Sequence, residues 1–141
     1  DVVLFLNGLP VATLETKNLL TGSTFRHAER QYRQDRSPAG EPLLTFKRGA
    51  LVHFAVSNRT VMMTTKLQGP STYFLPFNMG DHGAAGNPPN GKGHRTCYLW
   101  EQVWQRDSWL EIIGRYLVTK RDSKKQISID VIVAMITRKG T

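Results

Sequence analysis

Two apolar segments open the chain, and a turn dipeptide separates them. Residues 2–6 and 9–14 are almost entirely apolar, and Asn7-Gly8 lies between them. Asn-Gly between apolar segments is a strong hairpin signal, because both residues tolerate positive φ and the tight turn matches the twist of the strands. The pattern therefore predicts two antiparallel strands, the second of which ends in the polar tripeptide Glu15-Thr16-Lys17.

Helical periodicity follows the first hairpin. Phe25, Ala28 and Tyr32 recur at i, i+3 and i+7 and predict an amphipathic helix over 24–35. Farther along, residues 58–60 have turn composition and predict a second hairpin. The other predicted elements are strands over 51–56 and 61–65, a short edge strand over 72–77, a long loop over 80–93, a short helix around 99–104 and a helix opened by the capping box Ser108-Trp-Leu-Glu111.

The composition is typical of one soluble domain. The 141 residues are 40% hydrophobic, enough for a real core, and no apolar run approaches the roughly 18 residues of a membrane span. A single cysteine excludes an internal disulfide, and the four histidines show no zinc-ligand spacing. No signal peptide is visible, so we expect a cytoplasmic protein and no membrane partner.

The net charge narrows the class of partner. Nineteen Lys and Arg residues against eleven Asp and Glu give a net charge of +8. A basic protein suits a polyanionic partner, and nucleic acid is the first candidate. The alternative is a basic protein whose charge only keeps it soluble.

The polar end of the first hairpin carries candidate catalytic chemistry. Glu15 and Lys17 lie two residues apart and so project to the same face of a strand, while Asp1 precedes the partner strand. Carboxylate oxygens are hard ligands of the kind Mg²⁺ prefers, and a neighbouring lysine can offset the charge that develops on a phosphate under attack. The same tripeptide is also typical of a strand that leaves the core with solvated charges, so both interpretations stay open.

A metal site formed by Asp1 and Glu15 requires a hairpin register that places both residues on the same face of the sheet. With a strict two-residue loop, Asp1 would lie opposite Leu14 and on the face away from Glu15. A three-residue loop Asn7-Gly8-Leu9, with Gly8 left-handed in a G1-type bulge, shifts the register by one and sets Asp1 opposite Glu15. We therefore expect the three-residue loop.

The predicted helix over 24–35 adds basic and amide side chains. Arg26, Arg30 and Arg33 share the face opposite the apolar stripe, where they would contact phosphate or simply be solvated. Gln31 lies at the flank of the stripe, from which it could reach a site at the edge of the sheet.

The long loop contains a near match to a nucleotide-binding motif. Residues 86–93 resemble a phosphate-binding P-loop, but Gly93 replaces the Ser or Thr that would hold Mg²⁺, and Pro88 and Pro89 lack the backbone N–H groups that cradle phosphate. We interpret the match as a coincidence.

Seven blocks of the sequence together resemble the N-terminal nuclease domain of type I restriction enzyme R subunits. The resemblance runs from residue 1 to about residue 126, and agreement across separate blocks is more specific than the Glu-x-Lys tripeptide alone. The blocks are residues 1–18, Ala28-Glu-Arg-Gln31-Tyr-Arg, Leu51-Val-His-Phe-Ala-Val, Met63-Thr-Thr-Lys66-Leu, Phe74-Leu-Pro-Phe-Asn78, Gly86-Asn-Pro-Pro89 and Tyr98-Leu-Trp-Glu101.

This resemblance implies a fold and a chemistry. The implied fold is the α/β (α+β) restriction-endonuclease-like core of the PD-(D/E)xK superfamily, a central mixed sheet flanked by helices. In that family Asp1 and Glu15 would bind Mg²⁺, for which Mn²⁺ can substitute, and Lys17 would serve the attack of water on a DNA phosphodiester.

The resemblance also assigns supporting residues. Gln31 matches a glutamine that supports the site in this family. The usual tyrosine four residues later is replaced by Asp35, and Tyr32 adjoins the glutamine instead. The candidate DNA contacts are Arg26, Arg30, Arg33 and Tyr32.

The resemblance finally implies a larger assembly. We expect a nuclease domain over 1–126, without the family's upstream helix and downstream ATPase motor, and a tail over 127–141 that does not resemble the start of the motor. ATP would act only through that motor. The partners would be double-stranded DNA and the methyltransferase and specificity subunits of a type I restriction complex, with Mg²⁺-dependent endonucleolytic cleavage of DNA as the function.

Two other functions stay open at this stage. The first is a non-catalytic DNA-binding or subunit-docking fragment of the same subunit. The second is a protein-interaction module that uses an aromatic surface around Trp100, Trp104 and Trp109.

Overall fold

The computed structural model describes residues 1–17, 24–116, 120–121 and 127–128. The chain divides into two compact units, Asp1–Pro76 and Phe77–Thr141. The boundary expected between residues 126 and 127 stays a prediction, and residues 129–141 of the expected tail lie outside the described part of the chain.

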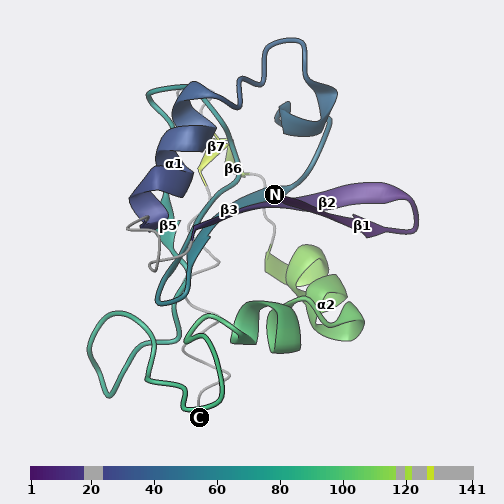
Figure 1. Cartoon of the computed structure of the whole chain (residues 1–141). Helices are drawn as coiled ribbons and strands as arrows, with labels where there is room; N and C mark the ends of the chain where they lie inside the picture. The colour runs from purple at the N-terminus through teal and green to yellow at the C-terminus, as the bar shows by residue number, and fades with distance from the viewer. Residues whose placement is uncertain (18–23, 117–119, 122–126, 129–141) are drawn as a thin grey trace. The chain divides into compact units, whose positions relative to one another are not determined.

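The first unit is built on a mixed five-stranded sheet (Figure 1). Its strands follow one another in chain order: β1 (Val2–Leu6), β2 (Leu9–Lys17), β3 (Val52–Ser57), β4 (Val61–Thr64) and β5 (Leu75–Pro76). Only β2 and β3 pair in parallel, and the other neighbours are antiparallel. A mixed sheet with a helical crossover confirms the predicted α/β class, and β5 confirms the short edge strand.

The first hairpin forms as predicted, but its loop differs from the expectation. The strands pair Leu6 with Leu9, Phe5 with Pro10, Leu4 with Ala12, Val3 with Thr13 and Val2 with Leu14. The connection is thus the two-residue turn Asn7-Gly8, with φ values of 50° and 78°, as a type I′ turn requires. The three-residue loop was wrong. The register shifts instead at a bulge in the body of the hairpin, where Val11 is the extra residue on β2.

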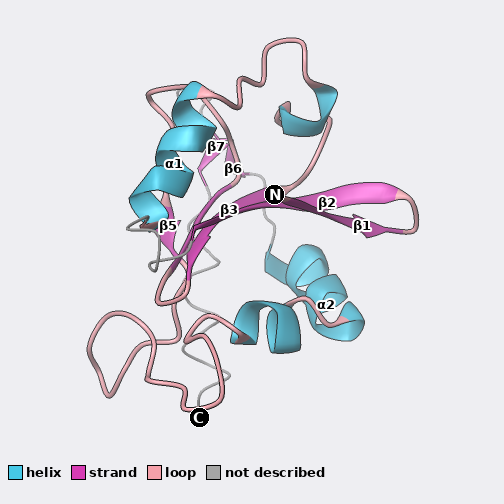
Figure 2. Ribbon diagram, viewed as in Figure 1, coloured by secondary structure: helices cyan, strands magenta, loops and turns pink. Residues whose placement is uncertain are grey.

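The parallel pairing of β2 and β3 requires a crossover, which α1 (Phe25–Gln34) supplies together with the short 3-10 helix η2 (Pro42–Leu44) (Figure 2). Thr24 is the N-cap of the helix, and its backbone N–H donates to His27 Nδ1 at 2.9 Å. Beneath the helix is a cluster of buried apolar residues from α1, η2, the sheet and the loops: Ala28, Tyr32, Leu44, Ala55, Leu67 and Phe74. The apolar stripe of the sequence thus faces the sheet, as its spacing predicts.

The second unit contains a π-helical turn, η3 (Leu99–Val103), followed by α2 (Arg106–Tyr116). The predicted capping box was wrong, because α2 already begins at Arg106 and the Trp109 N–H donates to the Gln105 carbonyl at 2.8 Å. Ser108 therefore lies inside the first turn rather than at its cap. Two short strands, β6 (Lys120–Arg121) and β7 (Ile127–Ser128), pair antiparallel.

Candidate carboxylate site on the first hairpin

The bulge at Val11 decides where the two candidate carboxylates point. With Val2 opposite Leu14, the next pair along the hairpin is Asp1 and Glu15, so both project from the same face of the sheet. Thr13, on that face of β2, contacts the hydroxyl of Tyr32 from α1. The face that carries the carboxylates is therefore the face that α1 covers.

Arg36 joins the two carboxylates directly. Its Nε donates to Glu15 Oε1 and its Nη2 donates to Asp1 Oδ2, each at 2.6 Å. Charge-assisted bonds of this kind are short and strong, and the planar guanidinium fork suits two carboxylate oxygens side by side. The structure thus brings Asp1 and Glu15 together through one shared cation.

Arg36 was missed by the sequence analysis, although the sequence contains a signal for it. The residue lies just after α1, four positions beyond Tyr32, and so continues the spacing of the stripe that faces the sheet. Its backbone N–H donates to the Gln31 carbonyl at 3.1 Å, which fixes the chain where the helix ends. This spacing places Arg36 on the side of the helix that faces the sheet but does not name its partners.

The two carboxylates differ strongly in burial. The Glu15 side chain is 4% exposed, whereas the Asp1 side chain is 57% exposed. Glu15 Oε2 is buried and has no hydrogen-bond partner in the described part of the chain. One buried oxygen of the pair is therefore left to bind something other than Arg36.

These donors fit a divalent cation such as Mg²⁺. Mg²⁺ is usually bound by one or two carboxylates, with its other positions filled by water or phosphate. Asp1 and Glu15 supply two carboxylates on one face, and the unpartnered Glu15 Oε2 is a suitable ligand atom. Over the described residues, no group of three or more His, Cys, Asp or Glu side chains gathers that could hold a metal ion. A cation here would therefore depend on these two residues and on water or substrate.

Lys17 lies on the strand that carries Glu15, and Gln31 lies on the helix that covers it. Lys17 is two residues beyond Glu15 on β2, about 7 Å along the strand, and shares its face. Gln31 is half-buried on α1, and its backbone carbonyl accepts from Asp35 and Arg36 at the end of the helix. In the described part of the chain, the cation that contacts both carboxylates is Arg36 rather than Lys17.

A buried polar network lies beside Glu15. Thr13 Oγ1 is 2.8 Å from the Tyr32 hydroxyl and 2.7 Å from His53 Nδ1. Burial lowers the pKa of His53 from 6.5 to about 4, so the imidazole is neutral at neutral pH. Burial, together with the nearby Glu15 carboxylate, raises the pKa of Tyr32, so its hydroxyl stays protonated. The network therefore ties the strand that carries Glu15 to α1 and β3 without a charge of its own.

Comparison with known protein families adds a decisive observation. The model of the family described as Type I restriction enzyme R protein N terminus matches residues 1–72, which is more than half of the chain. The chain belongs to this family. The comparisons with curated proteins and with solved structures gave no match.

The family explains the architecture of the first unit. The matched residues include β1 to β4, α1 and both carboxylates, and so nearly all of Asp1–Pro76. The mixed sheet and its crossover are an α/β restriction-endonuclease-like fold, and the family places the chain in the nuclease region of a type I restriction enzyme R subunit. No helix among the described residues is long and apolar enough to cross a membrane.

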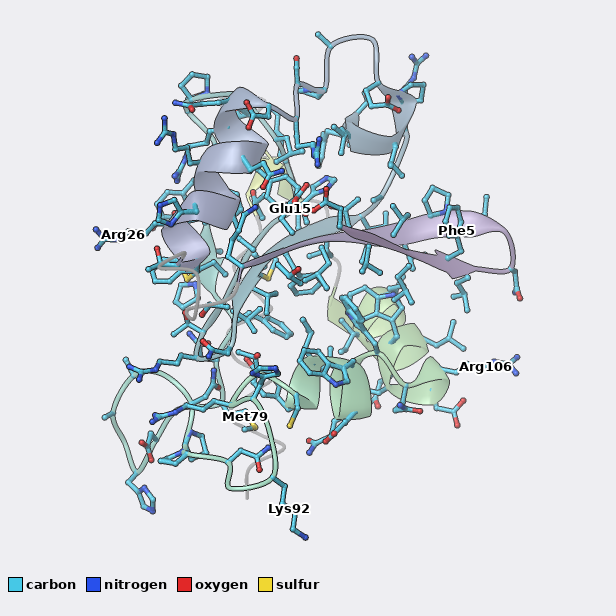
Figure 3. The ribbon with its side chains drawn as sticks, viewed as in Figure 1. Phe5, Glu15, Arg26, Met79, Lys92 and Arg106 are labelled. Carbon is cyan, nitrogen blue, oxygen red and sulfur yellow. The ribbon has the colours of Figure 1, made fainter. Side chains whose placement is uncertain are left out.

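The arginines of α1 occupy different environments in this member of the family. Arg26 is exposed and projects away from α1 (Figure 3), and Arg30 is exposed with its Nε bonded to Gln34. Arg33 instead pairs with Glu29 at 3.2 Å and lies 5.0 Å from the centre of the Phe74 ring. Arg33 is therefore ion-paired and partly buried against Phe74, whereas Arg26 and Arg30 are solvated. Contact of the three arginines with phosphate stays a prediction.

Proposed function

We propose that the chain is the nuclease module of a type I restriction-modification system and cleaves double-stranded DNA endonucleolytically with Mg²⁺. One observation carries the proposal. The Val11 bulge turns Asp1 and Glu15 to the same face, where one guanidinium binds both, in a chain that belongs to the R protein family. A hairpin without the bulge would separate the carboxylates to opposite faces.

The proposed roles follow from the residue types and from the strand face that they share. Asp1 and Glu15 hold the metal, with the buried Glu15 Oε2 as one ligand atom. When bound, Mg²⁺ polarises the phosphate and lowers the pKa of a bound water. Lys17, two residues beyond Glu15 on the same face of β2, offsets the charge that develops on the phosphate and orients the attacking water.

The remaining residues support the site or bind the DNA backbone. Tyr32 is buried with its hydroxyl on Thr13, so it supports the strand that carries Glu15 rather than contacting the duplex, and Gln31, the next residue on α1, keeps the supporting role that the family implies. The exposed Arg26 and Arg30 supply positive charge for the DNA backbone. Contacts of this kind position the duplex and carry no sequence information. Sequence recognition and methylation then belong to the specificity and methyltransferase subunits of the complex, and ATP acts only through its motor.

Nicking of supercoiled plasmid tests the proposal. The wild-type chain is incubated with Mg²⁺ or Mn²⁺, with and without EDTA, beside Lys17→Ala. Lys92→Ala is the matched control, because Lys92 is an exposed lysine in the second unit and lies in the P-loop-like segment that we interpret as a coincidence. We expect metal-dependent nicking in wild type and in Lys92→Ala, and a loss of roughly 100-fold or more in Lys17→Ala.

The outcomes separate the candidate functions. Equal nicking by wild type and Lys17→Ala would remove the site from the first hairpin. Complete inactivity of the wild-type chain together with salt-sensitive DNA binding would favour the non-catalytic DNA-binding fragment. Loss of activity in Lys92→Ala would show that Lys92 takes part in nicking, and the P-loop-like segment would then no longer be a coincidence.

A further inference from the structure

The Arg36 guanidinium already occupies the position of a cation between the two carboxylates. Its Nε and Nη2 are adjacent donors of one fork, and each is 2.6 Å from an oxygen of a different carboxylate. The pair of negative charges is thus partly neutralised from within the chain. A divalent cation shared by Asp1 and Glu15 would meet a like charge at this place.

The position of Arg36 in the chain allows its side chain to move away from the two carboxylates. Arg36 lies beyond Gln34, the last residue of α1, and Ser37 and Pro38 follow it in an irregular segment. Its side chain is 34% exposed, so part of it already reaches solvent, while the Glu15 side chain is 4% exposed and cannot follow it outward. The arginine can therefore swing into water while Glu15 stays buried on β2.

Arg36 also leaves the buried carboxylate incompletely satisfied. Only Glu15 Oε1 is bonded to the guanidinium, and Oε2 is buried and unpartnered in the described part of the chain. A metal ion can bind either or both oxygens of a carboxylate and bring its own water to fill the remaining positions. The cost of this unpartnered oxygen favours exchange of the arginine for a metal.

We propose that Arg36 is an internal counter-ion of the Asp1–Glu15 pair, which holds the carboxylates together when no metal is present and which a divalent cation displaces. This inference rests on the metal site of the proposed function. Removing Arg36 should make metal binding tighter, because the metal no longer competes with a fixed positive charge. A variant that fails to fold would bind metal more weakly, so the two effects have opposite signs.

The test is direct metal binding by the full chain. Mn²⁺ is titrated at fixed ionic strength by isothermal calorimetry and by the electron paramagnetic resonance signal of free Mn²⁺. The variants are Arg36→Gln, Arg36→Lys, Glu15→Gln and the charge-matched control Arg48→Gln, an exposed arginine on the loop before β3 in the same unit. We expect Arg36→Gln to bind Mn²⁺ roughly tenfold more tightly than wild type and Arg48→Gln to match wild type.

Arg36→Lys keeps the inference testable if Arg36→Gln does not fold. Lysine keeps the charge but lacks the fork that binds two carboxylates at once, so its Mn²⁺ affinity should exceed that of wild type and stay below that of Arg36→Gln. Equal or weaker binding by both Arg36 variants, with Glu15→Gln abolishing wild-type binding, would overturn the counter-ion and leave the metal site intact. No Mn²⁺ binding by wild type or by either Arg36 variant would overturn both proposals.

Discussion

The buried contact between Thr13 and His53 should make the stability of the first unit depend on pH. His53 is 1% exposed, and its Nδ1 lies 2.7 Å from Thr13 Oγ1. With the imidazole neutral, Nδ1 accepts from the Thr13 hydroxyl, which in turn accepts from Tyr32; this tautomer is inferred from the network. Protonation of His53 would place an unpaired charge in the core and remove this acceptor.

The pKa of His53 sets the size and sign of the effect. Burial lowers the pKa from 6.5 in the unfolded chain to about 4 in the folded one. The unfolded state therefore binds the proton first as the pH falls, and stability decreases by about 1.4 kcal/mol per pH unit between these two values. From neutral pH to about pH 5 the loss is about 2 kcal/mol, and below the folded pKa it levels off near 3 kcal/mol.

Urea unfolding at several pH values between about 5 and 7.5 measures this loss. Far-UV circular dichroism should be the probe, because all three tryptophans lie beyond residue 76 and their fluorescence reports on the second unit. His53→Gln keeps an acceptor for Thr13 but does not titrate, and His94→Gln, an exposed histidine, is the matched control. We expect the pH dependence to shrink by about 2 kcal/mol in His53→Gln alone.

Two outcomes would contradict the role of His53. If wild type and His53→Gln lost stability in parallel over the whole pH range, His53 would have the same pKa in the folded and unfolded states, and its burial would not lower that pKa. If His94→Gln removed the same pH dependence, the effect would belong to the general charge balance rather than to the buried site.

Three other substitutions test separate parts of the first unit. Gly49→Ala would drive its Cβ into the Leu43 carbonyl oxygen and should lower the free energy of unfolding by about 3 kcal/mol in the same urea assay. Gly91→Ala is the control, because its Cβ meets open space and should change the free energy of unfolding little. Tyr32→Phe removes a buried hydroxyl bonded to Thr13 and should cost ~1 kcal/mol; an unchanged unfolding midpoint would show that the bond contributes nothing. Arg26→Gln should reduce the log-log salt slope of duplex DNA binding by about 0.9, and an unchanged slope would remove Arg26 from the interface.

Local signals were sufficient for most elements of the first unit. Asn7-Gly8 fixed the turn of the first hairpin, and the spacing of Phe25, Ala28 and Tyr32 fixed both α1 and its buried face. The second hairpin also forms where the turn residues predict it, with the Ser57 N–H bonded to the Thr60 carbonyl. These features depend on residues close together in the chain, where propensity and periodicity are informative.

The geometry of the site depended on contacts that local signals do not encode. The turn chemistry of Asn7-Gly8 does not say that Val11, farther along β2, will be the extra residue that shifts the register. Arg36 is 21 residues from Glu15 and 35 from Asp1, so their ion pairs exist only once α1 has packed on the sheet. The residue types of the candidate carboxylate site were therefore predictable. The bulge that aligns the two carboxylates and the partners of Arg36 were not, although the spacing of Arg36 places it on the side of α1 that faces the sheet.

The two carboxylates lie at positions of unequal depth in the sheet. β1, which Asp1 precedes, is one of the two edge strands, and β2, which carries Glu15, is paired on both sides. Proteins open locally, and strands with fewer partners detach at a lower free energy than the core does. The complete pair therefore exists only in the fraction of molecules in which β1 is closed. If Asp1 and Glu15 bind a metal as proposed, the local unfolding equilibrium of β1, rather than the stability of the whole fold, limits the fraction of molecules that can do so.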